Sequence, residues 1–147
     1  MMTQATTPLP RLAALSTAVP PHRLDQADIL PAFDNAGIDT RYSCMPLDWF
    51  SEPRGWADKN ARYLDHALEL LTEAAETCLA AAGMTARDVD ALVTVSTTGI
   101  ATPSLDARLF ERLPFRAETT RLPIFGLGCA GGVNGLARAA EVAQARP

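Results

Sequence analysis

The chain has 147 residues, of which 48% are hydrophobic and 20% charged, a composition typical of a folded globular domain and not of a disordered segment. The formal net charge is −4 at pH 7 and the basic residues are scattered, which argues against nucleic acid or an anionic membrane as a partner. The first residues have no apolar signal-peptide core, and no unbroken apolar run reaches membrane-spanning length.

The N-terminal part of the chain predicts three elements. Residues 1–10 are rich in threonine and proline and predict a flexible lead-in. The apolar run at residues 12–19 predicts a strand, which two prolines close. Residues 25–36 predict a helix, with Asp25 as its N-cap and Gly37 as its stop.

An irregular segment is expected over residues 38–55, which contain two prolines and several aromatic side chains. Trp49, Phe50 and Trp56 gather in or beside this segment. These side chains could line a hydrophobic channel. A loop pinned onto the core by aromatic contacts is the favoured interpretation.

The longest predicted helix covers residues 58–82. Apolar residues recur from Leu64 to Ala82 at alternating spacings of four and three, which is the period of an amphipathic helix. Gly83 follows as a C-terminal stop.

Two further pairs of a strand and a helix follow. Residues 91–95 predict a buried strand, and residues 120–125 predict the next strand. Ser104 is the expected N-cap of a short helix between them, and residues 135–145 predict an alanine-rich helix after the second strand. The short helix carries three leucines, Leu105, Leu109 and Leu113. Strands that alternate with helices predict an α/β fold whose strands are at least partly parallel.

The three cysteines, Cys44, Cys78 and Cys129, are odd in number and far apart. They form neither a disulfide framework nor the ligand spacing of a zinc site, so we expect a reducing cytoplasm and no metal. Cys78 falls on the apolar stripe of the long helix, where a core role is expected rather than a chemical one.

Cys129 is the candidate nucleophile, because it stands between the last predicted strand and the last predicted helix, in the stretch Phe-Gly-Leu-Gly-Cys-Ala-Gly-Gly at residues 125–132. The glycines permit a sharp turn and the close approach of a substrate to the backbone. The positive end of the helix dipole favours a thiolate. A small buried cysteine in a tight turn is the alternative that these eight residues leave open.

A nucleophilic cysteine normally needs a base, which is often a histidine. His22 is expected in an exposed loop, and His66 on the long helix between the positions of its apolar stripe. Both are interpreted as solvated or structural residues rather than as the partner of Cys129.

The glycines at positions 126, 128 and 131 also match the dinucleotide-binding pattern G-x-G-x-x-G. That interpretation requires an acidic residue about 20 positions further on, at the end of a second strand. The printed sequence ends before that point, and Glu141 falls inside the predicted helix. NAD binding is therefore the weakest of the alternatives.

Two blocks of sequence, residues 97–106 (TTGIATPSLD) and 125–132 (FGLGCAGG), resemble the type III polyketide synthases. This is the chalcone and stilbene synthase family. Within it, the sequence motifs are most similar to those of the bacterial alkylpyrone, alkylresorcinol and tetrahydroxynaphthalene synthases. Residues 38–42 and 46–50 also resemble the N-terminal segment of the family. The resemblance implies the N-terminal half of a thiolase-like fold over residues 11–147, in a protein that forms homodimers.

The resemblance also implies a chemistry and roles for particular residues. Members of the family load an acyl-CoA starter onto a cysteine, extend it by decarboxylative condensation with malonyl-CoA and cyclise the product. Cys129 matches the acyl-carrying nucleophile, and Arg41 a basic contact to the CoA phosphates. Thr97 and Thr98 match residues near the acyl pocket, and Thr102 matches the position that reaches into the partner subunit's cavity. Beyond the CoA thioesters that serve as substrates, no cofactor is implied.

The sequence departs from the family in one respect. The catalytic histidine and asparagine of the family lie in the second half of a longer chain, and nothing here matches them. We therefore expect this chain to be an N-terminal portion that needs the missing C-terminal half and to be inactive in condensation when alone. Two alternatives stay open, a ketoacyl synthase of the fatty-acid initiation type and a non-catalytic dimerisation fragment with an exposed sheet edge. The Gly-Cys-Ala-Gly-Gly turn and the Thr-Pro-Ser-Leu-Asp block favour the polyketide family over the ketoacyl synthase.

Overall fold

The computed structural model describes residues 9–26 and 37–145. Its helices and strands follow one another as β1 (His22–Asp25), β2 (Thr40–Ser43), α1 (Trp56–Ala81), β3 (Ala91–Ser96), α2 (Leu105–Leu109), β4 (Thr120–Phe125) and α3 (Gly131–Ala145). Short 3₁₀ turns intervene at η3 (Leu47–Ser51), η4 (Ala86–Asp88) and η5 (Gly128–Ala130). The alternation of strands and helices from β3 onward confirms the predicted α/β class. No described helix is both long and apolar enough to cross a membrane.

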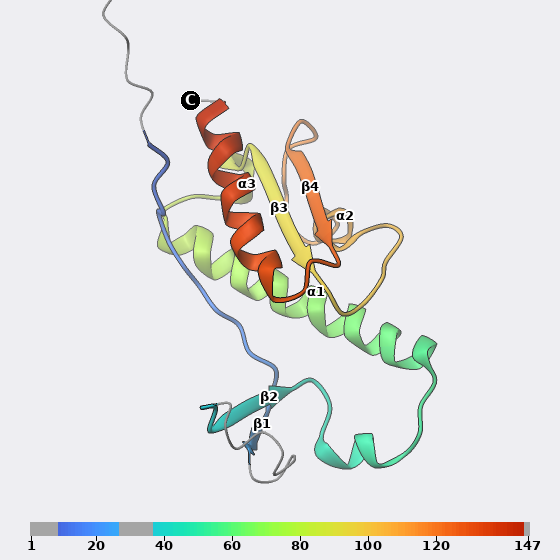
Figure 1. The fold of residues 1–147 in the computed structure, drawn as a ribbon. Coiled ribbons are helices and arrows are strands. Elements are labelled where there is room, and N and C mark those ends of the chain that lie inside the picture. The colour runs from blue at the N-terminus through green and yellow to red at the C-terminus, as the bar shows by residue number, and fades with distance from the viewer. Residues whose placement is uncertain (1–8, 27–36, 146–147) are drawn as a thin grey trace, which may run out of the picture.

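A parallel pair of strands, β3 and β4, forms the middle of a three-layer unit. The pair is in register from Ala91 opposite Thr120 to Ser96 opposite Phe125. Figure 1 shows α3 across one face of the pair, with α1 and α2 on the other side. Because side chains alternate between the faces of a strand, Leu92 faces the core of α1 and α2 while Val95 faces α3.

The hydrophobic core lies between the strand pair and the two helices α1 and α2. Its buried members are Ala86 of η4, Leu109 of α2 and Leu113 beyond it. Partly buried apolar side chains from α1, from β3 and from the loop after α2 pack against them: Leu68, Leu71, Ala75, Leu79, Leu92 and Phe115. The predicted long helix is thus confirmed, with the apolar face that its periodicity indicates.

The helix α3 begins at Gly131, four residues earlier than the sequence predicts. A Cβ atom on Gly131 would lie 2.7 Å from Cγ1 of Val95, and one on Gly135 would lie 2.7 Å from Cγ2 of the same side chain. Glycine at both positions therefore allows the first turns of α3 to lie directly on β3. This packing stabilises a helix start that glycine disfavours by propensity alone.

The predicted strand at residues 12–19 is wrong for this structure, since that segment forms no strand. Among the described residues, β3 and β4 pair with each other and with no third strand. The segment instead runs beside α3, where Pro10 and Leu12 share a groove with Leu136. An apolar run forms a strand only when a partner strand takes up its backbone hydrogen bonds.

The predicted N-cap at Asp25 is also wrong, because Asp25 ends β1 opposite Thr40 of β2. The remainder of that predicted helix, residues 27–36, lies outside the described residues. β1 and β2 form an antiparallel ladder that starts with His22 opposite Ser43. His22 is thus half-buried in a strand and not in an exposed loop.

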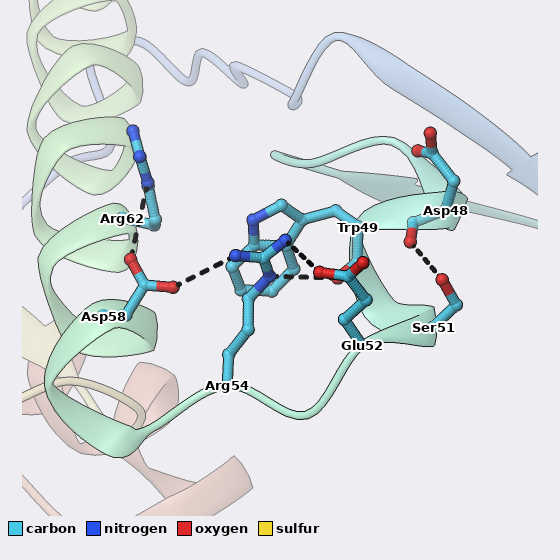
Figure 2. A network of polar contacts seen from close by, with 7 residues as sticks. All are labelled: Asp48, Trp49, Ser51, Glu52, Arg54, Asp58 and Arg62. Carbon is cyan, nitrogen blue, oxygen red and sulfur yellow. Dashed lines mark hydrogen bonds and ion pairs between the residues drawn. The ribbon is translucent and has the colours of Figure 1, made fainter.

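The turn η3 is tied to the start of α1 by Arg54, as Figure 2 shows. The guanidinium of Arg54 lies 4.8 Å from the centroid of the Trp49 ring, and its Nε donates to the Trp49 carbonyl oxygen over 3.3 Å. It also lies 3.4 Å from a carboxylate oxygen of Glu52 and 3.7 Å from one of Asp58. Phe50, in contrast, is exposed. The aromatic segment is therefore fixed to the end of a helix and not pinned onto the core as the sequence suggested.

Candidate active site around Cys129

The turn between β4 and α3 presents Cys129. Gly126 has a φ of +83° and Gly128 a φ of +56°, both in the left-handed region that glycine tolerates best. η5 follows at once, and the Gly131 N–H donates to the Gly128 carbonyl oxygen as α3 begins. Cys129 is exposed at the N-terminal end of this 15-residue helix, so the buried-turn alternative is wrong here.

The loop after β3 lies beside the same turn. β3 and β4 are parallel and in register, so residues that follow Ser96 and Phe125 leave the same edge of the strand pair. Cγ2 of Thr97 lies 3.9 Å from the place of a Cβ on Gly131, two residues after the cysteine. The structure thus brings Thr97 next to the start of the helix that carries Cys129, with Thr98 exposed beside it.

A cavity of about 290 Å³ opens on the α2 side of the strand ends. Its hydroxyl-bearing lining residues are Thr94, Ser96 and Ser104, and the rest of the lining is apolar or glycine: Gly99, Ile100, Ala101, Leu105, Pro123, Ile124 and Phe125. Cys129 is not among the lining residues. Thr102 is exposed on the same loop, next to the lining residue Ala101, and precedes a cis peptide bond to Pro103.

Arg41 lies on β2, away from this turn. Figure 1 shows the β1–β2 hairpin outside the three-layer unit. Nε of Arg41 donates to Oε1 of Gln26 over 2.8 Å, and the Arg41 side chain is half-buried. The structure therefore does not bring Arg41 together with Cys129.

Neither histidine partners the candidate nucleophile. Nδ1 of His66 lies 3.2 Å from Oε2 of Glu69 on the same face of α1, while His22 is held in β1. Within residues 9–26 and 37–145 the structure records no hydrogen bond or ion pair of the Cys129 side chain, and no three metal-ligating side chains gather. Among the described residues, the candidate nucleophile thus has no histidine partner.

The other two cysteines differ from Cys129 in exposure. Cys78 is half-buried on α1 and Cys44 is half-buried after β2. Burial raises the pKa of the Cys44 thiol, and the nearby Glu69 carboxylate raises it further. A raised pKa lowers the fraction of reactive thiolate, so Cys44 is a poor nucleophile at neutral pH.

An ion pair with a buried carboxylate, which the sequence did not reveal, joins α2 to β4. Oδ2 of Asp106 lies 3.4 Å from a guanidinium nitrogen of Arg121, and the Asp106 side chain is only 1% exposed. Cζ of Arg121 lies 5.5 Å from the centroid of the Phe110 ring. No sequence pattern predicts this ion pair, because Asp106 and Arg121 meet only when α2 packs against β4.

Comparison with known families gives a match over most of the chain. The family described as chalcone and stilbene synthases, N-terminal domain, matches residues 58–147. The 1,3,6,8-tetrahydroxynaphthalene synthase of Streptomyces peucetius subsp. caesius is 41% identical over 145 residues, which cover 86% of this chain and 38% of that protein. The putative chalcone synthase of Bacillus subtilis (strain 168) is 40% identical over 124 residues, which cover 81% of this chain and 34% of that protein.

Solved structures agree with this match. The 1,3,6,8-tetrahydroxynaphthalene synthase of Streptomyces coelicolor A3(2), a bacterial type III polyketide synthase, aligns with a TM-score of 0.81 at 27% identity over 91% of this chain and 44% of that one. PKS-I of the brown alga Ectocarpus siliculosus aligns over 99% of this chain and 47% of that one, with a TM-score of 0.76 at 24% identity. The chain thus spans less than half of the length of the relatives that it matches.

Proposed function

Since this chain belongs to the chalcone and stilbene synthase family, whose members are type III polyketide synthases, we propose that Cys129 carries the acyl group during polyketide synthesis. The fold is the N-terminal half of the thiolase-like architecture. The observation that carries the proposal is the exposed thiol at the start of α3, presented by the left-handed glycines Gly126 and Gly128.

The proposed reaction is a transfer of an acyl group between two sulfur atoms. The Cys129 thiolate attacks the thioester carbonyl of an acyl-CoA, a new carbon–sulfur bond forms, and the bond to the CoA sulfur breaks. CoA leaves as a thiolate and takes up a proton from solvent. The positive end of the α3 dipole favours the attacking anion at this place.

Condensation with malonyl-CoA is proposed for the complete protein only. In the family this step depends on a histidine and an asparagine, and no residue of this sequence matches either. We expect the chain by itself to load an acyl group but to form no polyketide. Arg41 as a CoA phosphate contact and Thr102 as a residue that reaches a partner subunit stay predictions.

The proposed partners are a second copy of the chain and the C-terminal half of the family fold. The outer side of α3 supports this part of the proposal, because Val133 is 74% exposed and Leu136 is 67% exposed. Apolar side chains that are this open on one helix face mark a surface that another element covers. The unpaired cysteines favour a reducing compartment, and we propose the cytoplasm.

Mass spectrometry of the chain after incubation with an acyl-CoA tests the loading step. We expect a mass increase of one acyl group, sensitive to hydroxylamine, which Cys129→Ala abolishes. The matched controls Cys44→Ala and Cys78→Ala should load like the parent chain. Loading that persists in Cys129→Ala would overturn the proposal.

A non-catalytic interaction fragment is the second candidate, and the exposed apolar face of α3 favours it as well. Alkylation by iodoacetamide separates the two candidates. A preset nucleophile reacts at a pH well below the ordinary thiol value of about 8.5, and an inert thiol does not. A slow Cys129 combined with no acyl loading would leave only the fragment.

A further inference from the structure

Two side chains of α1 hold the loop that follows β3. Nδ2 of Asn60 donates to the Ile100 carbonyl oxygen over 2.9 Å, and the Ile100 N–H donates to Oδ1 of Asn60 over 3.0 Å. One amide thus satisfies both backbone groups of a single loop residue, as a neighbouring strand would.

Tyr63 stands one helical turn further along the same side of α1. Its hydroxyl lies 2.7 Å from the Ser96 hydroxyl at the end of β3, within hydrogen-bond distance. A Cβ on Gly99 would lie 2.1 Å from Cδ1 of Tyr63, so the ring fills the space that this buried glycine leaves. The loop is therefore anchored at its beginning by Tyr63 and at Ile100 by Asn60.

The residues between Ser96 and Ile100 are Thr97, Thr98 and Gly99, and the family resemblance places the two threonines near the acyl pocket. Thr97 also reaches the start of α3, through the 3.9 Å approach of its Cγ2 to the place of a Cβ on Gly131. We infer that Asn60 and Tyr63 are positioning residues that hold Thr97 against the α3 start, beside Cys129.

The physical basis is the entropy of a short glycine-containing loop. Without its anchors, the segment from Ser96 to Ile100 samples many backbone states, and few of them keep Thr97 at α3. Asn60 and Tyr63 act on the thiol only through this loop, since neither touches Cys129. The consequence for acyl loading depends on the proposed function, whereas the position of Thr97 does not.

The test uses two variants with matched controls. Asn60→Ala removes both hydrogen bonds to Ile100, and exposed Asp65→Ala on the same helix is its control. Tyr63→Phe removes only the bond to Ser96 and keeps the ring against Gly99, and Tyr42→Phe on β2 is its control. Tyr63→Phe removes a single hydroxyl group, so this variant still tests the inference if Asn60→Ala does not fold.

Two measurements are made on each variant. The nuclear Overhauser effect between the Thr97 methyl group and the α protons of Gly131 reports the position of the loop. The rate of loading from a limiting acyl-CoA is compared with the rate of iodoacetamide alkylation, which needs only an accessible thiolate. We expect Asn60→Ala to weaken the Overhauser effect and to slow loading about fivefold, as the loss of hydrogen bonds of ordinary net strength predicts, while alkylation stays nearly unchanged.

The outcomes separate the proposed function of Cys129 from the inference about the loop anchors. If the parent chain does not load at all, the proposed function fails, and the Overhauser effect alone decides the inference. An effect that is as strong in Asn60→Ala and Tyr63→Phe as in the parent overturns the inference. Loading at the parent rate in variants that have lost the effect also overturns it, because the loop position then has no consequence for the thiol.

Discussion

Asp106 and Arg121 join α2 to β4 through an ion pair whose carboxylate is almost wholly buried and whose guanidinium is partly exposed. Asp106 lies at the start of α2, and Arg121 lies at the start of β4. Removal of either partner therefore leaves the other in a different environment, and the two single variants need not be equivalent.

Arg121→Met is expected to destabilise the fold by about 3 kcal/mol, because it leaves a buried carboxylate without its counter-charge. Adding Asp106→Asn to this variant should recover part of the loss, since the neutral amide carries no unpaired charge. Urea unfolding of the two single variants and the double variant measures the coupling. Additive losses would show that the two side chains do not interact.

Gly135→Ala is expected to destabilise the fold by about 1 kcal/mol or more, because the added methyl group meets Val95 at 2.7 Å. Gly132→Ala on the same helix is the matched control, since nothing lies within 4 Å of a Cβ there. That variant should stabilise the helix by about 0.5 kcal/mol through lower backbone entropy in the unfolded state. Thermal unfolding should shift in opposite directions for the two variants, and a shift of the same sign would contradict the close contact.

The contribution of Asp88 to stability should depend on pH. Hydrogen bonds from the Thr85 hydroxyl and from the Thr85 N–H hold the pKa of the Asp88 carboxyl below its ordinary value of 3.8. The folded state therefore binds this proton less readily than the unfolded state. The stabilisation is complete above about pH 4 and is lost as the pH falls through the folded-state value.

Asp88→Asn tests this dependence. The variant should be less stable than the parent at pH 7, and the difference should shrink as the pH falls below about 4. Exposed Glu118→Gln serves as the control for the loss of one surface carboxylate. A difference in unfolding free energy that stays constant from pH 7 to pH 3 would refute the hydrogen-bonded carboxylate.

Cys44 should react with iodoacetamide only at high pH. Burial raises its pKa above the ordinary value of a thiol, and the carboxylate of Glu69 adds to the shift. Glu69→Gln should move the labelling midpoint downward without abolishing the shift, because burial is the larger cause, and Glu73→Gln on the same helix should leave it in place. A midpoint at or below that of an unperturbed thiol in the parent chain would contradict the buried environment.

The sequence predicted the elements whose apolar pattern matches their packing. α1 and the strands β3 and β4 lie within two residues of their expected bounds, because their apolar residues recur at a helical period or form short apolar runs. The start of α3 was missed, since glycine is a poor helix former and the close packing of Gly131 on Val95 is a tertiary contact that the local pattern does not show.

Elements that depend on pairing between polar segments were not predictable in this way. β1 and β2 contain the sequences His-Arg-Leu-Asp and Thr-Arg-Tyr-Ser, in which no apolar alternation marks a strand. The place of Cys129 at a turn before a helix could be predicted, because glycines separate an apolar run typical of a strand from a run typical of a helix. The anchors Asn60 and Tyr63 could not, since a helix pattern does not say which distant loop a polar side chain meets.

The parallel pairing of β3 with β4 also ties the Cys129 turn to the rest of the unit. The two strands come from parts of the chain that α2 and its flanking loops separate, so their pairing is a non-local contact. The packing of Gly131 and Gly135 on Val93 and Val95 fixes where α3 begins on the face of β3. Displacement of α3 from β3 would therefore move the turn that carries Cys129, and the accessibility of this thiol reports whether that packing is intact.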